Sequence, residues 1–138
     1  MRKLEGCVFC SVENLEGEYI VYRDEDVIAF LDIYPVSRGH TLVAPREHYE
    51  TIFEVPDDVL CKLIVVTKRV ANAVRKALKP DGVRIVQNNG KAAGQVIFHL
   101  HFHVIPFYEG VHRGRRRLEE REGLELQRLL SEALGYEA

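Results

Sequence analysis

The sequence predicts one domain built around a β-sheet, with one long helix packed on the sheet. The chain has 138 residues and is 46% hydrophobic, which suffices for one compact core and leaves too little for two. Five short runs have the composition of β-strands. One further stretch repeats its apolar residues at helical spacing over about five turns, and its apolar face needs a sheet to cover.

The first three strands come before the helix. The β-rich runs Tyr19–Tyr22 and Val27–Leu31 predict a hairpin, because the polar segment Arg23–Asp26 joins them. After a turn at Ser37–Gly39, the run His40–Ala44 predicts a third strand, which the next proline ends.

The long helix follows Pro56, with Asp57 as its predicted N-cap, and ends before the segment Lys79–Gly82. Its apolar positions are Leu60, Leu63, Ile64, Thr67, Val70, Ala71, Val74 and Leu78. Cys61, near the start of this helix, is interpreted as a buried small hydrophobic residue.

Two more strands follow the helix. The run Val83–Gln87 predicts the fourth strand, and Val96–Phe107 predicts the fifth. The loop Asn88–Gln95, which contains two glycines, separates them. Strands therefore dominate, with few helices among them.

Residues 109–138 form a tail with a mixed charge pattern. A basic cluster, Arg113 with Arg115–Arg117, precedes an acidic, helix-like segment that ends at Leu134. We interpret the tail as a solvated end that packs on the domain or on a neighbouring subunit. Its arginines could instead bind a polyphosphate or RNA.

The overall charge is nearly balanced, with 19 basic and 21 acidic side chains, so nothing demands nucleic acid or an anionic membrane as a partner. No apolar run approaches the length of a membrane span, and Met1–Gly6 leads into no secretory segment. Three cysteines suit a reducing compartment better than a disulfide framework. We expect a soluble, cytoplasmic protein.

The run FHLHFHV places His99, His101 and His103 at every second position of an apolar strand. Side chains alternate across a strand, so the histidines share one face, about 6.5–7 Å apart at the backbone. The opposite face, expected to be core, carries Val96, Phe98, Leu100, Phe102 and Val104. The alternative is a surface face that holds histidines by chance, but three in register next to a glycine-containing loop favour a chemical site.

Imidazole is substantially neutral near pH 7 and can attack phosphorus with one nitrogen while the other keeps its proton. If His101 attacks a phosphoryl centre, one flanking histidine can fix its tautomer or bind a metal, and the other can donate to phosphate oxygens. The covalent intermediate would be a phosphoramidate on His101.

These residues resemble the signature of the histidine triad (HIT) proteins, His-x-His-x-His followed by two apolar residues, which His99–Ile105 matches fully. Further blocks that match the family are Ala29–Asp32, Gly39–Pro45 and Asn88–Gln95. The resemblance covers roughly residues 7–108 and implies a single α+β domain over 1–138. It implies an antiparallel sheet of about five strands, one long helix, a shorter C-terminal helix, and a homodimer whose sheets join.

The resemblance also assigns roles to single residues. His101 resembles the family's nucleophile, His103 the residue that contacts the α-phosphate, and His40 a member of the same histidine cluster. Asp32 stands where the family's carboxylate receives the ribose hydroxyls, a suitable task for a group that only accepts hydrogen bonds. From the residues alone, Asp32 could equally be a turn residue before Tyr34.

The loop before the histidines carries the remaining substrate contacts that the resemblance implies. Asn88 stands where the family has an amide near the phosphate, and Gly94 and Gln95 bring backbone N–H groups and a side-chain amide to the same place. Val96 departs from the family, since several members have serine or threonine there. Valine cannot donate a hydrogen bond, so we expect weaker hydrolysis of some substrates.

Cys7 and Cys10 have the spacing of zinc ligands, and a tetrahedral site needs two more. In the bacterial and archaeal branch that this chain most resembles, His48 and His99 would complete a structural zinc site. A redox pair is the first alternative, although a hairpin follows the motif in place of the βαβ setting of such pairs. Two plain buried cysteines are the second alternative.

The resemblance implies a nucleotide hydrolase that cleaves the α-phosphate bond of dinucleoside polyphosphates or AMP-amines through a nucleotidyl-histidine. One alternative is a nucleotidyltransferase that uses phosphate or another acceptor. The other is a nucleotide-binding module with slow turnover, although such a module is expected to lose the central histidine, which is present here as His101.

Overall fold

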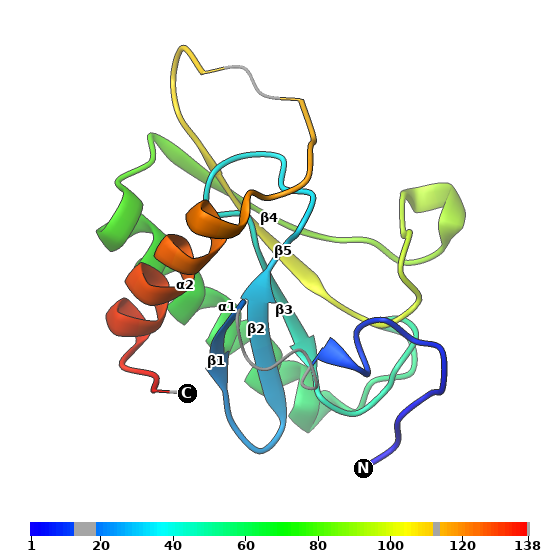
Figure 1. Ribbon diagram of the computed structural model, residues 1–138. Helices are drawn as coiled ribbons and strands as arrows, with labels where there is room; N and C mark the ends of the chain where they lie inside the picture. The colour runs from blue at the N-terminus through cyan, green and yellow to red at the C-terminus, as the bar shows by residue number, and fades with distance from the viewer. Residues whose placement is uncertain (13–18, 112–113, 138) are drawn as a thin grey trace.

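The computed structural model of the protein describes residues 1–12, 19–111 and 114–137 (Figure 1). Its elements in chain order are β1 (Ile20–Arg23), β2 (Val27–Leu31), β3 (Thr41–Pro45), α1 (Asp57–Leu78), β4 (Gly82–Gln87), the short 3-10 helix η2 (Lys91–Ala93), β5 (Phe102–Phe107) and α2 (Glu120–Leu134). The predicted α+β fold with one long and one shorter C-terminal helix is confirmed. No helix within these described ranges is both long and apolar enough to cross a membrane.

The five strands form one antiparallel sheet in the order β1-β2-β3-β5-β4. Its centre joins β3 to β5, two strands that lie about sixty positions apart in the chain, with Leu42 paired to His103. Residues directly opposite in an antiparallel pair point to the same face. His103 therefore lies on the same face of the sheet as Leu42.

Both helices cover the other face of the sheet (Figure 1). Val43, Phe102 and Val104 join the main core there, together with Leu63, Val70 and Val74 of α1 and Leu126 and Leu130 of α2. A smaller cluster on the opposite face includes Ile28, Phe30 and Leu42. The helices thus stabilise one side and leave the histidine side to form a site.

The C-terminal segment is part of the core. Leu118, Leu126 and Leu130 are buried in the main cluster, and α2 packs on β1 and α1. The approach is close at Gly123, where an added Cβ would stand 2.3 Å from the ring of Tyr19. The tail therefore packs on the domain, as one of the two sequence interpretations had it, while Arg113 lies outside the described residues.

The fifth strand begins at Phe102, so the prediction that it starts at Val96 is wrong. Val96 is 81% exposed and Phe98 is 41% exposed, and neither belongs to the core. The ladder with β3 reaches only as far as Val43 opposite Phe102, and β3 ends soon afterwards at Pro45, which has no N–H to donate. The preceding residues therefore form a separate loop, bent at residues 97–99, which carries His99 and His101.

Three details of the long helix also differ from the prediction. Pro56, with extended backbone angles, occupies the N-cap, and Asp57 is the first helical residue. Ile64 is 48% exposed, and Cys61 is exposed as well, so the interpretation of Cys61 as buried is wrong. The reason is rotational: the buried stripe runs through Leu63, Val66, Thr67, Val70, Ala73 and Val74, and Cys61 lies off it.

Candidate active site and metal centre

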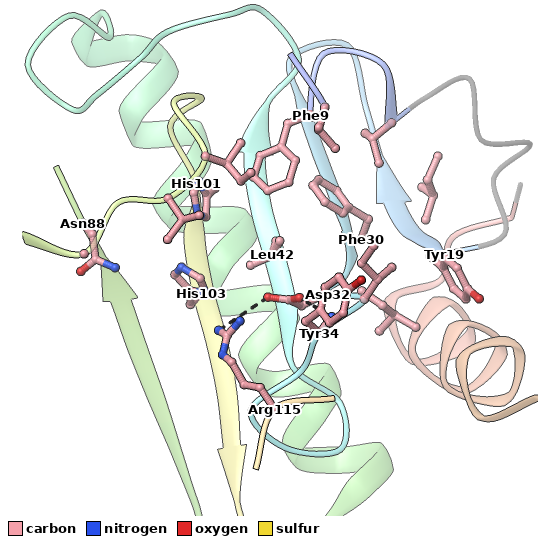
Figure 2. A pocket seen from close by; sticks show the side chains of 18 residues that line it. Phe9, Tyr19, Phe30, Asp32, Tyr34, Leu42, Asn88, His101, His103 and Arg115 are labelled. Atoms are coloured by element: carbon pink, nitrogen blue, oxygen red, sulfur yellow. Dashed lines mark hydrogen bonds and ion pairs between the residues drawn. The ribbon is translucent and has the colours of Figure 1, made fainter. Parts of the chain in front are cut away.

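His101 is buried and lines a cavity of about 690 Å³ on the histidine side of the sheet (Figure 2). Its Nδ1 lies 2.6 Å from the backbone carbonyl of His99. A carbonyl only accepts, so Nδ1 carries the proton and donates it, which leaves a bare lone pair on Nε2. His101 is thereby held in the tautomer that a nucleophile requires.

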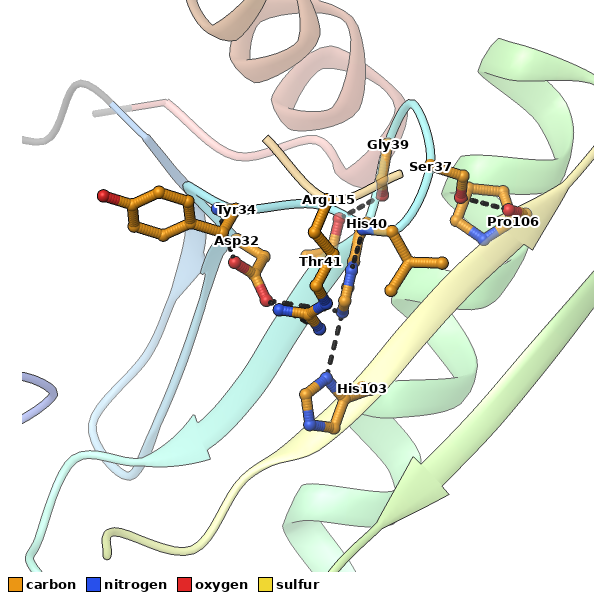
Figure 3. A network of polar contacts seen from close by, with 10 residues as sticks. Asp32, Tyr34, Ser37, Gly39, His40, Thr41, His103, Pro106 and Arg115 are labelled. Carbon is orange, nitrogen blue, oxygen red and sulfur yellow. Dashed lines mark hydrogen bonds and ion pairs between the residues drawn. The ribbon is translucent and has the colours of Figure 1, made fainter. Parts of the chain in front are cut away.

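A chain of hydrogen bonds fixes the tautomers of His40 and His103 (Figure 3). The backbone N–H of Val36 donates to Nδ1 of His40 at 3.0 Å, so a neutral His40 carries its proton on Nε2. That nitrogen lies 2.9 Å from Nδ1 of His103 and donates to it. His103 consequently carries its own proton on Nε2, and it lines the same cavity as His101.

Burial keeps the three histidines neutral at pH 7. It lowers the pKa of His40 to about 4, although the Asp32 carboxylate raises this pKa in part. Burial also lowers the pKa of His103 to about 4 and lowers the pKa of His101. Neutral imidazoles suit the two inferred tasks, a lone pair on one ring and a donor N–H on its neighbour.

Asp32 serves both the turn and the cavity. One carboxylate oxygen accepts the N–H of Tyr34 at 2.8 Å, which is the turn interaction that the sequence allowed. The other oxygen lies 3.5 Å from Nε2 of His40, and Asp32 lines the cavity. Asp32, His40 and His103 could also cluster around a cation. The direct 2.9 Å contact between the two histidines instead makes them hydrogen-bond partners.

The loop after β4 contributes Asn88 and Gly94 to the cavity. Gln95 does not line it, and its predicted role changes accordingly. Its side-chain amide donates to the carbonyls of Glu50 and Ile97 and accepts the N–H of Gly90. The backbone N–H groups of Gly94 and Gln95 donate to carbonyls of the same loop. Gln95 therefore shapes the loop, and its donors are already engaged within the protein.

The rest of the cavity wall is largely apolar, and sequence reasoning missed it. Its side chains come from the N-terminal segment and from β1 to β3, and they include Val8, Phe9, Val12, Ile20, Phe30 and Leu42. Phe9 packs edge-on against His101, with ring centroids 4.9 Å apart, and against Phe30 at 5.1 Å. The sequence signal for this wall was Phe9, which lies between the two cysteines of the predicted zinc site. An apolar wall of this kind suits a flat heterocycle.

Cys7, Cys10, His48 and His99 form a second cluster of side chains, separate from the cavity. Their ligand atoms all lie within 4.8 Å of one another, and three of the four residues are buried. Around tetrahedral zinc, a sulfur and a nitrogen ligand stand about 3.6 Å apart and two nitrogens about 3.3 Å apart. Three of the four S–N separations are 3.3–3.5 Å, and the two Nδ1 atoms are 3.2 Å apart. The donor set and its spacing fit zinc.

The surroundings prepare these four side chains for a cation. Nε2 of His99 donates to the carbonyl of Pro45 at 2.8 Å, which leaves Nδ1 bare and aimed at the thiols. Backbone N–H groups of Leu4 and Cys10 point at the sulfurs of Cys10 and Cys7. Four protein ligands fill a tetrahedral shell, so the site is structural and has no position for substrate.

The fold and the two sites define the class of protein, and comparison with known sequences agrees. The HIT domain family matches residues 16–110, and the chain belongs to this family. A HIT-like protein of Saccharolobus solfataricus is 52% identical over 101 residues, which are 72% of this chain and 73% of that one. An adenylylsulfatase of Arabidopsis thaliana is 41% identical over 101 residues, covering 72% of this chain and 51% of that protein.

Solved structures agree over most of the chain. A histidine triad nucleotide-binding protein from Sulfolobus tokodaii has a TM-score of 0.87 at 44% identity, covering 94% of this chain and 92% of that one. A zinc-bound histidine triad family protein from Mycobacterium smegmatis has a TM-score of 0.81 at 38% identity, covering 94% of each. Together with the ligand geometry, the zinc-bound relative supports structural zinc as the cofactor of the Cys₂His₂ site.

Proposed function

We propose that this protein is a nucleotide hydrolase that cleaves the α-phosphate bond of nucleoside 5′-phosphoric anhydrides or phosphoramidates. The observation that carries the proposal is the pair of opposite tautomers in the cavity. His101 keeps a bare Nε2 because Nδ1 donates to His99, and His103 keeps a protonated Nε2 because Nδ1 accepts from His40. A nucleophile and a donor side by side match the two needs of phosphoryl transfer.

The reaction would run in two displacements at one phosphorus. Nε2 of His101 forms a P–N bond while the bond from phosphorus to the leaving group breaks, and the leaving group departs with the electron pair. Water then attacks the same phosphorus, the P–N bond breaks, and the nucleoside monophosphate is released with the histidine regenerated. The N–H of His103 and the amide of Asn88 would hold the phosphate oxygens as charge develops.

The cavity also offers partners that suit the rest of a nucleotide. Asp32 has one oxygen directed at the cavity, which suits two ribose hydroxyl donors. The apolar wall around Phe9 and Phe30 suits the base. The zinc ligands would hold His99 and the N-terminal segment in place and take no part in bond breaking. The adenylylsulfatase relative supports adenylyl sulfate, another anhydride of the α-phosphate, as a third test substrate.

The test measures AMP release by chromatography from diadenosine tetraphosphate, adenosine 5′-phosphoramidate and adenylyl sulfate. We expect the wild type to release AMP and His101→Ala to lose at least about a thousandfold in rate. Zinc content and thermal unfolding of the variant serve as controls for folding. Equal rates in the two proteins would contradict the histidine mechanism.

Two further outcomes separate the alternatives. ADP formation when inorganic phosphate is added would favour nucleotidyl transfer over hydrolysis. Tight AMP binding with no turnover of any of the three substrates would favour a nucleotide-binding module.

We also propose a homodimer in which two sheets join. The supporting observation is β4, which forms an edge of the sheet and exposes Ile85 to 43%. An uncovered edge strand is a natural place for a second copy to pair. Light scattering should give about twice the chain mass of 15.8 kDa. The mass of a single chain at micromolar concentration would contradict the dimer.

A further inference from the structure

The described residues that line the cavity supply one charged partner for a phosphate. Among the lining residues that the structure describes, Asp32 is the one carboxylate and Arg115 is the one permanent cation. His103 also lines the cavity, and burial keeps it neutral at pH 7 by lowering its pKa to about 4. An anionic phosphate placed near Asp32 would be repelled unless a cation stood close by.

The chain holds Arg115 at this place through the residues that follow it. Leu118 is buried in the main core, and its N–H donates to the carbonyl of Ile33 at 2.7 Å. The guanidinium of Arg117 lies over the ring of Tyr34, 5.8 Å from the centroid. These contacts attach the segment before α2 to the loop that carries Asp32. Arg115 reaches the cavity from there, with its head group between Asp32 and His103 (Figures 2 and 3).

Asp32 is the charge partner of Arg115, but it leaves the guanidinium free of a hydrogen bond to its carboxylate and able to bind a phosphate. It stands 3.9 Å from the nearer carboxylate oxygen of Asp32, which is too long for a hydrogen bond, and its side chain is 51% exposed. Five donors in a planar fork can bind phosphate oxygens in pairs. Arg115 also lies beyond residue 110, where the match to the HIT domain ends, so it is a feature of the tail of this chain.

We propose that Arg115 is a phosphate-binding residue of the nucleotide site, which contacts the α-phosphate beside His103 and compensates the charge of Asp32. This proposal rests on the proposed nucleotide site but does not require turnover. It predicts that Arg115 contributes to the affinity for a nucleotide and contributes nothing to the affinity for the nucleoside.

The test compares the binding of AMP and adenosine by titration calorimetry to the wild type, Arg115→Gln and Arg116→Gln. Arg116 is the matched control, because it is an exposed neighbour that lies outside this cavity. We expect Arg115→Gln to weaken AMP binding by about tenfold or more, as for the loss of a charged hydrogen bond, and to change adenosine binding less than twofold. Arg116→Gln should match the wild type, and Arg115→Lys should recover part of the AMP affinity.

Each contrary result has a separate meaning. Equal AMP affinity in Arg115→Gln and the wild type would overturn the role of Arg115 while leaving the nucleotide site intact. An equal loss of AMP and adenosine affinity would show that Arg115 acts through Asp32 and would also overturn the phosphate contact. A wild type that binds neither ligand would overturn the proposed nucleotide site itself.

Discussion

The backbone carbonyl of His99 lies 2.6 Å from Nδ1 of His101, while the imidazole of the same His99 faces the sulfur of Cys10 at 3.4 Å. His99 therefore belongs to the metal centre through its ring and contacts His101, the proposed nucleophile, through its backbone. A metal ion that holds the ring of His99 therefore also helps to hold its backbone carbonyl, which sets the tautomer of His101. His99 thus connects the metal centre directly to His101.

Loss of a metal ligand should consequently affect both stability and activity. We expect Cys10→Ser to lose bound zinc, to lower the free energy of unfolding by at least about 2 kcal/mol, and to slow AMP release. Zinc analysis of protein purified without chelator, urea unfolding and the AMP-release assay measure these three effects. Cys61→Ser is the matched control, since Cys61 is exposed on α1. Full zinc content in Cys10→Ser would refute the assignment of this cysteine as a ligand.

A hydroxyl at position 96 should speed the breaking of the bond to the leaving group. Val96 lines the cavity and is 81% exposed, so Val96→Thr adds a donor of nearly the same shape at little cost in stability. One added hydrogen bond of about 1 kcal/mol predicts a rise of roughly fivefold in kcat for at least one substrate. Val96→Ala changes the size without adding a donor and serves as control. Identical rates in all three proteins would remove the idea.

His40 and His103 should take up protons at a lower pH in the folded protein than in the unfolded chain. The pKa values of His40 and His103 are about 4 in the fold because of burial, against an ordinary value of 6.5. The unfolded chain therefore takes up these protons first as the pH falls below 6.5. The contribution of these two histidines to the free energy of unfolding should be fully present above pH 6.5. It should decline toward pH 4 by about 1.4 kcal/mol per pH unit for each proton.

Nitrogen NMR of the imidazole rings checks this directly and also reports the tautomers. Both rings should remain neutral at pH 5.5, with the proton of His103 on Nε2. The same protein unfolded in urea provides the reference titration near 6.5. Midpoints at that reference value in the folded protein would contradict the inferred burial effect.

The turn before β3 requires a glycine for two separate reasons. Gly39 has φ +95°, and a Cβ there would stand 2.3 Å from Cδ1 of Leu78 at the end of α1. Gly39→Ala should cost about 2–3 kcal/mol of unfolding free energy and should disturb the neighbouring His40. Gly110 has φ +75°, and among the residues that the structure describes nothing lies within 4 Å of an added Cβ, so Gly110→Ala isolates the backbone cost, about 1 kcal/mol. Equal losses in thermal unfolding would show that the contact with Leu78 is unimportant.

Much of the architecture could be predicted because it depends on local patterns. The β-rich composition of short runs and the turn residues between them predicted the strands. A 3.6-residue repeat predicted α1, because burial of one helix face imposes that period. The spacing of Cys7 and Cys10 suggested a zinc site, and the family resemblance implied His48 and His99 as its other two ligands. The family resemblance then supplied the expected positions of Asp32, His40 and Asn88, which the structure brings to one region around the cavity.

What only the tertiary structure decided depends on contacts between distant segments. Whether a strand starts at Val96 or at Phe102 depends on where β3 stops offering partners, and no pattern within the fifth run contains that information. The pairing of Leu42 with His103 brings His40 to His103, and the packing of Leu118 brings Arg115 to Asp32. The sequence by itself determined which chemical groups are present and which local elements form. The tertiary structure decided which groups meet, because tautomers, pKa values and charge partners follow from neighbours that are remote along the chain.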